Sequence, residues 1–315
     1  MPHKRTMNDR QDVLASDLWE LPKVSQGLWT WACIAIETLP NEVGNLIHLR
    51  YLDLSETKLV ELPETVSNLR ILQTLRLNSC DKLHRLPEGL RKLLSLRHLE
   101  INYTISLNRL PQGLEGLKCL QTLSKFVVSE EGCKLRELSN LHGSLAITEI
   151  GGGSKEAGDA KLKSNKHLGI LGLEFTKAEK GKIIYDASDL ELFEPHPNLE
   201  ELEIHYYSGS KFPSWMEFPM KQSLFMLRRL IIRECRNFEI LPPLAKLESL
   251  QYLSVEALDL ISPIGLFNFF EALMVVAYPN LQQLHIRGMK HWEEEAMEIS
   301  RDINVMPLFQ ILGVY

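Results

Sequence analysis

The chain has 315 residues, of which 44% are hydrophobic and 24% charged, an ordinary globular composition that suits one large or two small domains. Its 35 Lys and Arg against 41 Asp and Glu give a net charge of −6, so it lacks the basic excess of a typical nucleic-acid-binding protein. The longest apolar run, residues 27–36, is about half the ~20 residues that a membrane-spanning helix needs.

The cysteines and the N-terminus predict a reducing environment. There are five cysteines, an odd number with no CxxC pair, which fits buried thiols rather than a disulfide framework. The first residues are polar and basic, unlike a secretory signal. We therefore expect a cytoplasmic protein without a membrane span.

Residues 37–126 carry a regular repeat. The frame LxxLxxLxL begins at Leu46 and returns at Leu69, Leu93 and Leu117, and a Leu-Pro pair keeps the same phase. A step of 23 or 24 residues falls within the 20–29 residue period of leucine-rich repeats. The sequence therefore predicts an α/β leucine-rich-repeat solenoid, with a curved parallel sheet on the concave face and loops and short helices on the convex face.

Residues 127–315 continue the pattern less regularly. Strand frames of the type LxxLxL recur at Leu168, Leu199, Leu227, Leu250 and Leu281, and a last, truncated repeat begins near Pro307. The two parts differ in charge: residues 46–126 contain 12 basic and 8 acidic residues, a net +4, whereas residues 127–315 contain 19 and 27, a net −8. The two parts therefore present different electrostatic fields to a partner.

Each repeat predicts one short strand and one turn. In the alternation LxL both leucines point inward, and the intervening residues face outward. Thr57, Cys80, Thr104 and Cys235 fall at the position where the repeat requires a small polar residue. We expect their side chains to bond backbone groups that would otherwise be unpaired in the turn.

The outward positions of the strands predict a protein-binding face. Solenoids use their concave surfaces for binding, and Arg and Tyr are enriched at interface hot spots. For any single residue, a solvated strand position without a binding role is the alternative. The predicted binding residues are Arg50, Tyr51, Asp53, Arg76, Arg97, His98, Tyr103, Glu201, Glu203, His205, Tyr206, Arg229, Arg233, Tyr252, His285 and Arg287.

Catalytic, cofactor-binding and metal-binding residues are not expected. His98, His205 and His285 fall in distant repeats, and no HxxH or HExxH spacing occurs. The segment Gly151–Lys155 lacks the spacing of a phosphate-binding loop. The sequence therefore favours a binding module over an enzyme.

Several phrases resemble a known family. "NLIHLRYLDLSETKLVELPETVSNLRILQTLRL", "HPNLEELEIHYYSGSKFPSWM" and "GMKHWEEE" are similar to the repeats of plant coiled-coil type nucleotide-binding leucine-rich-repeat disease resistance proteins. The resemblance covers residues 39–315. Residues 1–36 resemble a remnant of the nucleotide-binding domain or a linker, which we expect to be poorly ordered or helical.

The resemblance implies a protein-recognition and autoregulatory module of a plant intracellular immune receptor, acting in defence against pathogens. The expected partners are proteins: the receptor's nucleotide-binding domain, a pathogen effector or a guarded host protein. No cofactor is expected, because the family's ATP/ADP site is missing from this chain. The alternatives are a truncated fragment and a general leucine-rich-repeat signalling scaffold with no role in defence.

Overall fold

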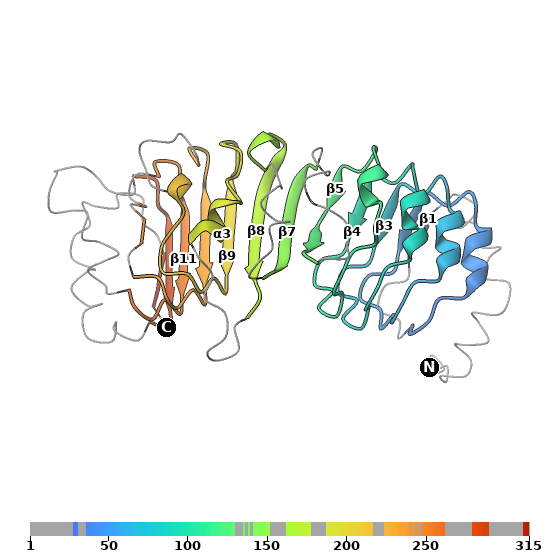
Figure 1. Cartoon of the computed structure of the whole chain (residues 1–315), viewed down its shortest axis with the longest axis horizontal. Helices are drawn as coiled ribbons and strands as arrows, with labels where there is room; N and C mark the ends of the chain where they lie inside the picture. Colours follow the sequence, from blue (N-terminus) through green and yellow to red (C-terminus); the bar gives the residue numbers. More distant parts are fainter. Residues whose placement is uncertain are drawn as a thin grey trace, which may run out of the picture. The chain divides into compact units, whose positions relative to one another are not determined.

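The computed structural model forms two compact units (Figure 1), residues 1–125 with 131–133, and residues 126–130 with 134–315. The parts of the chain that it describes are residues 28–30, 36–129, 135, 138, 141–151, 162–177, 187–216, 224–239, 241–242, 244, 247–261, 279–289 and 311–314. No helix in these ranges is long and apolar enough to cross a bilayer.

The first unit contains a five-stranded parallel sheet whose strands follow chain order. Leu52, Leu75 and Leu99 lie side by side in this sheet and are fully buried, which confirms the predicted repeat. The strands are β1 (Leu28–Thr30), β2 (Tyr51–Asp53), β3 (Thr74–Arg76), β4 (His98–Glu100) and β5 (Thr122–Leu123).

The strand β1 differs from the sequence-based expectation. A helix or poor order was expected through residue 36, yet Leu28–Thr30 pairs with β2 in parallel. Trp29 faces Leu52 across the pair, 23 residues away, so the repeat period extends further back than the Leu-Pro markers indicated. The rest of the expected remnant, residues 1–27 and 31–35, lies outside the described residues.

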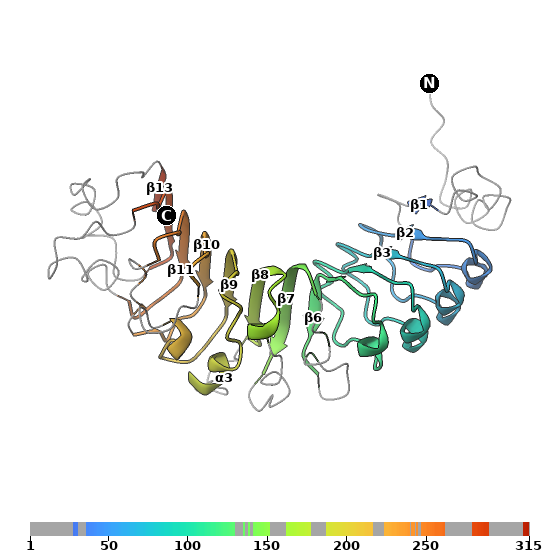
Figure 2. The same ribbon diagram turned by 90° about the horizontal axis from the view of Figure 1, so that it is seen from above.

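Short 3₁₀ helices form the side of the first unit opposite its sheet (Figure 2), where loops or short helices were expected. Three of them follow a proline in an extended conformation, with φ close to −65°, the angle that its ring fixes. Each of the four helices ends where the backbone N–H of the following leucine donates to the carbonyl three residues earlier. They are η2 (Asn41–Asn45), η3 (Glu64–Asn68), η4 (Glu88–Lys92) and η5 (Leu114–Gly116).

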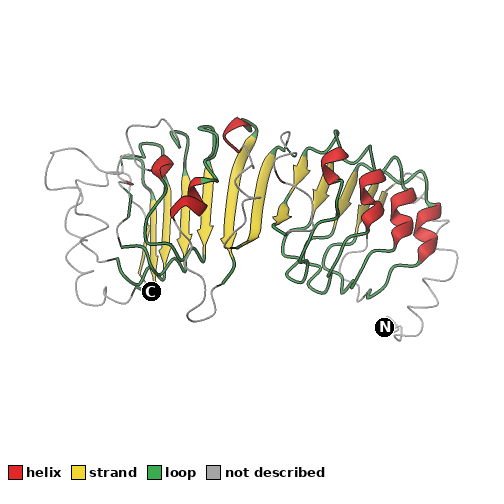
Figure 3. Cartoon of the chain, in the orientation of Figure 1, coloured by secondary structure: helices red, strands yellow, loops and turns green. Residues whose placement is uncertain are grey.

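The second unit contains an eight-stranded sheet, also in chain order (Figure 3). Every pair from β7 to β13 is parallel, so the irregular frames predicted after residue 127 do form strands. The strands are β6 (Lys125–Val127), β7 (Gly143–Ile150), β8 (Leu168–Phe175), β9 (Glu201–His205), β10 (Arg229–Arg233), β11 (Tyr252–Glu256), β12 (Gln283–Arg287) and β13 (Ile311–Val314).

The connections of the second unit carry short helices and buried aromatic residues. The helices are η7 (Leu162–Ser164), α3 (Ala187–Glu191) and η8 (Ser214–Met216). Tyr207 contacts Phe175 and Phe238 with ring centroids 4.9 and 5.4 Å apart, and Trp215 donates from Nε1 to the Leu190 carbonyl at 3.2 Å. These large side chains are fully buried and form the core behind this sheet.

The predicted turn bonds are present. Thr57 and Thr104 donate through Oγ1 to the carbonyls of Leu54 and Ile101, both at 2.8 Å. Cys80 Sγ lies 3.2 Å from the Leu54 carbonyl oxygen, and the buried Cys235 makes the equivalent, longer contact at 3.7 Å. The threonines therefore tie each turn to its own strand, and the cysteines tie their turns to the strand of the preceding repeat.

Candidate protein-binding face

The candidate site is the outer face of the two sheets, the face on which alternate residues point away from the buried leucines. Its side chains are mostly half-buried, because neighbours from adjacent strands lie against one another at the ~4.8 Å strand spacing. In the first unit, residues 23 or 24 apart in sequence therefore become direct neighbours. The face is described below for each unit separately.

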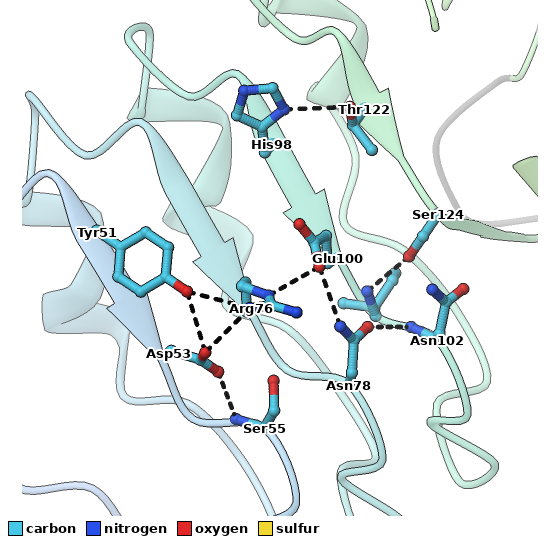
Figure 4. Close-up of polar contacts among 11 residues, drawn as sticks. Tyr51, Asp53, Ser55, Arg76, Asn78, His98, Glu100, Asn102, Thr122 and Ser124 are labelled. Carbon is cyan, nitrogen blue, oxygen red and sulfur yellow. Dashed lines mark hydrogen bonds and ion pairs between the residues drawn. The ribbon is translucent and has the colours of Figure 1, made fainter. Parts of the chain in front are cut away.

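Arg76 is the centre of a polar network in the first unit (Figure 4). Its Nη1 donates to Tyr51 Oη at 3.2 Å and lies 3.4 Å from an Asp53 carboxylate oxygen. Its Nε donates to Glu100 at 2.8 Å. The hydrogen bond with Tyr51, followed by the bond and charge of Glu100, raises the pKa of Arg76, so this guanidinium stays charged throughout the accessible pH range.

The network continues toward the carboxyl ends of the strands. Asn78 donates from Nδ2 to Glu100 at 3.1 Å and accepts the Asn102 backbone N–H at 2.9 Å. Ser124 Oγ accepts the Ile101 N–H at 2.7 Å. At the other end of β4, His98 Nδ1 lies 3.1 Å from Thr122 Oγ1. The bonds of Arg76 and Asn78 to the Glu100 carboxylate are charge-assisted and hold these side chains in one geometry, so this part of the face is organised before any partner arrives.

Five of the seven predicted residues of the first unit fall into two groups. Tyr51, Asp53 and Arg76 lie together in the network, and Asp53 is only 8% exposed, so it positions Arg76 rather than offering a free carboxylate. Arg50 and Arg97 lie where the chain enters β2 and β4; both are exposed, and neither has an ion-pair partner within the described residues.

Tyr103 lies apart from the network, in the turn after β4. It is 77% exposed and has a φ of 57°, a left-handed conformation that is unfavourable for a bulky residue.

The sequence reasoning missed the partners Glu100 and Asn78 as members of one network. The signal was the spacing of Asp53, Arg76 and Glu100, three alternating charges at 23 and 24 residues.

In the second unit the predicted residues form contacts along neighbouring strands. Arg229 on β10 pairs with Glu201 on β9, with Nε and the carboxylate oxygen 3.7 Å apart. Its guanidinium also lies 4.2 Å from the ring centroid of Tyr252 on β11. The Tyr252 ring in turn is 5.2 Å from that of His285 on β12. Four strands thus contribute to one row of aromatic and charged side chains.

A second group of contacts lies nearer the carboxyl ends of the same strands. Arg233 Nε is 3.3 Å from a Glu256 carboxylate oxygen, and Arg287 is the register partner of Glu256 on the next strand. Tyr206 directly follows β9, and Lys177 Nζ lies over its ring, 5.1 Å from the ring centroid.

Glu203 and His205 make a contact within a single strand. Glu203 accepts from His205 Nε2, with 3.5 Å between the two atoms. This bond, and next the nearby positive charges, lower the pKa of Glu203 against the opposing effect of its partial burial. Glu203 is therefore a carboxylate at neutral pH and contributes negative charge to the face.

Comparison with known proteins identifies the repeats. The family described as "leucine-rich repeat region" matches residues 36–310. A disease resistance protein of Arabidopsis thaliana is 45% identical over 82% of this chain, and disease resistance protein RGA2 of Solanum bulbocastanum is 40% identical over 69%. The chain covers 19% and 23% of the length of these two relatives, so it corresponds to one region of them.

A third relative, RPP13-like disease resistance protein 1 of Arabidopsis thaliana, is 35% identical over 81% of this chain and 26% of its own length. Among solved structures, the crystal structure of a TDR receptor has a TM-score of 0.48 at 19% identity, over 88% of this chain and 44% of that chain. The chain therefore belongs to the leucine-rich repeat region family, in the form found in plant disease resistance proteins of the nucleotide-binding leucine-rich-repeat type.

Proposed function

We propose that the chain is the protein-recognition and autoregulatory module of a plant intracellular immune receptor. Its relatives are disease resistance proteins over most of its length, and a solenoid sheet offers an extended surface for a protein. The partners would be proteins: the receptor's nucleotide-binding domain for the first unit, and a pathogen effector or guarded host protein for the second.

The observation that carries the proposal is a difference among the arginines of the first unit: one is paired within the face and two are exposed. Arg76 is held by Tyr51, Asp53 and Glu100. Arg50 and Arg97 instead lie exposed at the strand entrances without an ion pair among the described residues. Exposed arginines beside a rigid polar network suit an acidic partner surface, because Arg binds carboxylates bidentately and loses little entropy in doing so.

The test is a binding assay between this chain and the nucleotide-binding domain of a related receptor, measured at low and high salt. The double variant Arg50→Gln with Arg97→Gln should weaken binding by about tenfold or more, which corresponds to ~1.4 kcal/mol, and should reduce its salt dependence. The matched control, Lys92→Gln with Lys118→Gln, removes the same charge from exposed positions in and beside the 3₁₀ helices and should leave binding unchanged.

Two results would contradict the proposal. One is no salt-sensitive association with any such domain. The other is an equal loss of binding in both double variants, which would indicate a general charge effect and no specific docking at the strand entrances. A cooperative thermal transition in every variant is required before either result is interpreted.

A further inference from the structure

The outer face of the second unit changes character between β8 and β9. On β7 the partly exposed outward positions are Ser144 and Ala146, and on β8 they are Ile170, Gly172 and, near the end of the strand, Glu174. On β9 they are Glu201, Glu203 and His205. The register makes the change abrupt, because Ile170 is paired with Glu201 and Gly172 with Glu203.

The β7–β8 face, defined as Ser144, Ala146, Ile170 and Gly172, leaves the sheet backbone close to the surface. Gly172 is paired with Ala146 on β7, so two residues with almost no side chain lie next to each other. Ile170 keeps 37% of its surface exposed, although it is a large aliphatic residue on a strand. An approaching chain can therefore come near the backbone here and cover apolar surface.

The absence of a side chain at residue 172 is not forced by packing. A Cβ at Gly172 would lie 3.6 Å from the Cα and Cβ of Ala146, an ordinary van der Waals distance. The φ of Gly172 also lies outside the left-handed region that favours glycine. An alanine would fit, so folding alone does not explain why this position is bare.

Carboxylates border this bare face on one side. A Glu201 carboxylate oxygen lies 3.7 Å from Arg229 Nε, and a Glu203 carboxylate oxygen lies 3.5 Å from His205 Nε2. Glu174 and Glu200, at the end of β8 and the entrance of β9, are exposed and have no ion pair within the described residues. The sequence from residue 127 onward has 19 basic and 27 acidic residues, so the long-range field has the same sign as the local one.

We propose that the β7–β8 face is a docking surface for an extended basic segment of a protein partner. The aliphatic stem of a Lys or Arg would lie over Gly172 and Ala146 and against Ile170, and its charged group would reach Glu203 or Glu174. Long basic side chains combine an apolar stem with a charged end in this way. The surface rests on the proposed recognition function and specifies the chemistry of the partner for the second unit.

The test uses two fluorescein-labelled peptides, one alternating lysine and serine and the other alternating glutamate and serine. Binding to the whole chain is followed by fluorescence anisotropy at low and high salt. The lysine peptide should bind and the glutamate peptide should not. Gly172→Trp, which fills the bare face, should weaken lysine-peptide binding by about tenfold, the size of effect expected from blocking one charge-assisted contact.

Two further variants make the test specific. Gly116→Trp places the same large residue on the first unit, where a Cβ meets nothing within 4 Å, and should also bind normally. Glu203→Gln should weaken binding by a few-fold without adding bulk, and it keeps the proposal testable if Gly172→Trp does not fold.

The outcomes separate this inference from the proposed function. A folded Gly172→Trp or Glu203→Gln variant that binds the lysine peptide as tightly as the unchanged chain would overturn the docking surface. Equal binding of both peptides would do the same. Hydrogen-exchange protection should appear on β7–β9; protection on β2–β4 alone would also refute it. None of these results depends on Arg50 and Arg97, on which the nucleotide-binding-domain assay rests.

Discussion

Arg76 on β3 donates from Nε to a Glu100 carboxylate oxygen on β4 at 2.8 Å, across one strand spacing and 24 residues of sequence. The side chains are 38% and 29% exposed. Arg76 has a second acidic neighbour in Asp53, on its other side. Arg76 therefore links three consecutive repeats, and its loss should affect the stability of the first unit as well as the shape of its outer face.

The coupling between Arg76 and Glu100 should exceed that of an exposed pair with the same spacing. Arg85 and Glu61 also lie 24 residues apart, but their side chains are 66% and 52% exposed. Exposed ion pairs contribute ~0.2–1 kcal/mol, and membership of a network raises the value. Double-mutant cycles with alanine, measured by urea unfolding, should give about 1 kcal/mol for Arg76–Glu100 and less than half of that for Arg85–Glu61. Equal coupling energies would contradict the network.

Gly44 allows two 3₁₀ helices of the first unit to lie close together. A Cβ at Gly44 would lie 2.7 Å from both the backbone oxygen and the Cβ of Thr65, and a backbone atom cannot rotate away. Overpacking of this kind costs about 1–3 kcal/mol. Gly44→Ala should therefore lower the free energy of unfolding by that amount, as measured by urea denaturation.

The matched control for Gly44 is Gly116→Ala. Gly116 also lies in a 3₁₀ helix, but a Cβ there would meet nothing within 4 Å. Alanine should leave stability unchanged or raise it slightly, because it reduces the entropy of the unfolded chain. A Gly44→Ala variant as stable as Gly116→Ala would show that the helices can move apart at no cost.

Buried thiols should resist alkylation while the chain is folded. Burial raises the pKa of Cys235 to about 12 and also raises the pKa of Cys80, so both thiols stay protonated at pH values near 8, where only the thiolate reacts. Cys119 is exposed. Among the three cysteines in the described ranges, iodoacetamide labelling with site-resolved mass spectrometry should modify Cys119 first, and Cys80 and Cys235 only in denaturant. Early labelling of Cys235 would indicate local opening of its turn.

The repeat could be predicted from sequence because its determinants are local and periodic. Leu52, Leu75 and Leu99 occupy one position of the frame, and stacking necessarily places them side by side. The polar turn residues Thr57 and Cys80 were predictable for the same reason. β1 was harder to predict because Leu28–Thr30 carries Trp29 where the later strands carry leucine, and the frame LxL is absent.

The candidate site was less predictable than the fold. The outward direction of Arg76 follows from strand alternation, but its capture by Tyr51, Asp53 and Glu100 depends on side-chain reach across strands. The bare surface at Gly172 was missed because the sequence reasoning looked for charged and aromatic residues, and an absent side chain gives no such signal. The proposed docking role of Gly172 depends on its pairing with Glu203 in the sheet register, which only the structure reveals.

The Glu203–His205 contact predicts a defined acid dependence. The hydrogen bond from His205 is the largest cause that lowers the pKa of Glu203 below its ordinary value of 4.5. Replacing His205 with alanine should therefore raise the pKa of Glu203 back toward 4.5, as measured by ¹³C NMR of its carboxyl carbon. His285→Ala, which removes a histidine three strands away in the same sheet, should leave this titration unchanged.

The sign of the stability effect follows from the same lowered pKa. Below pH 4.5 the unfolded chain takes up a proton at residue 203 more readily than the folded chain does, so protonation favours unfolding. The stabilisation from this pair is therefore present above about pH 4.5 and is lost as the pH falls through the folded-state pKa of Glu203. Glu203→Gln should flatten this part of the acid-unfolding curve. A curve as steep as that of the unchanged chain would assign the acid sensitivity to other carboxylates.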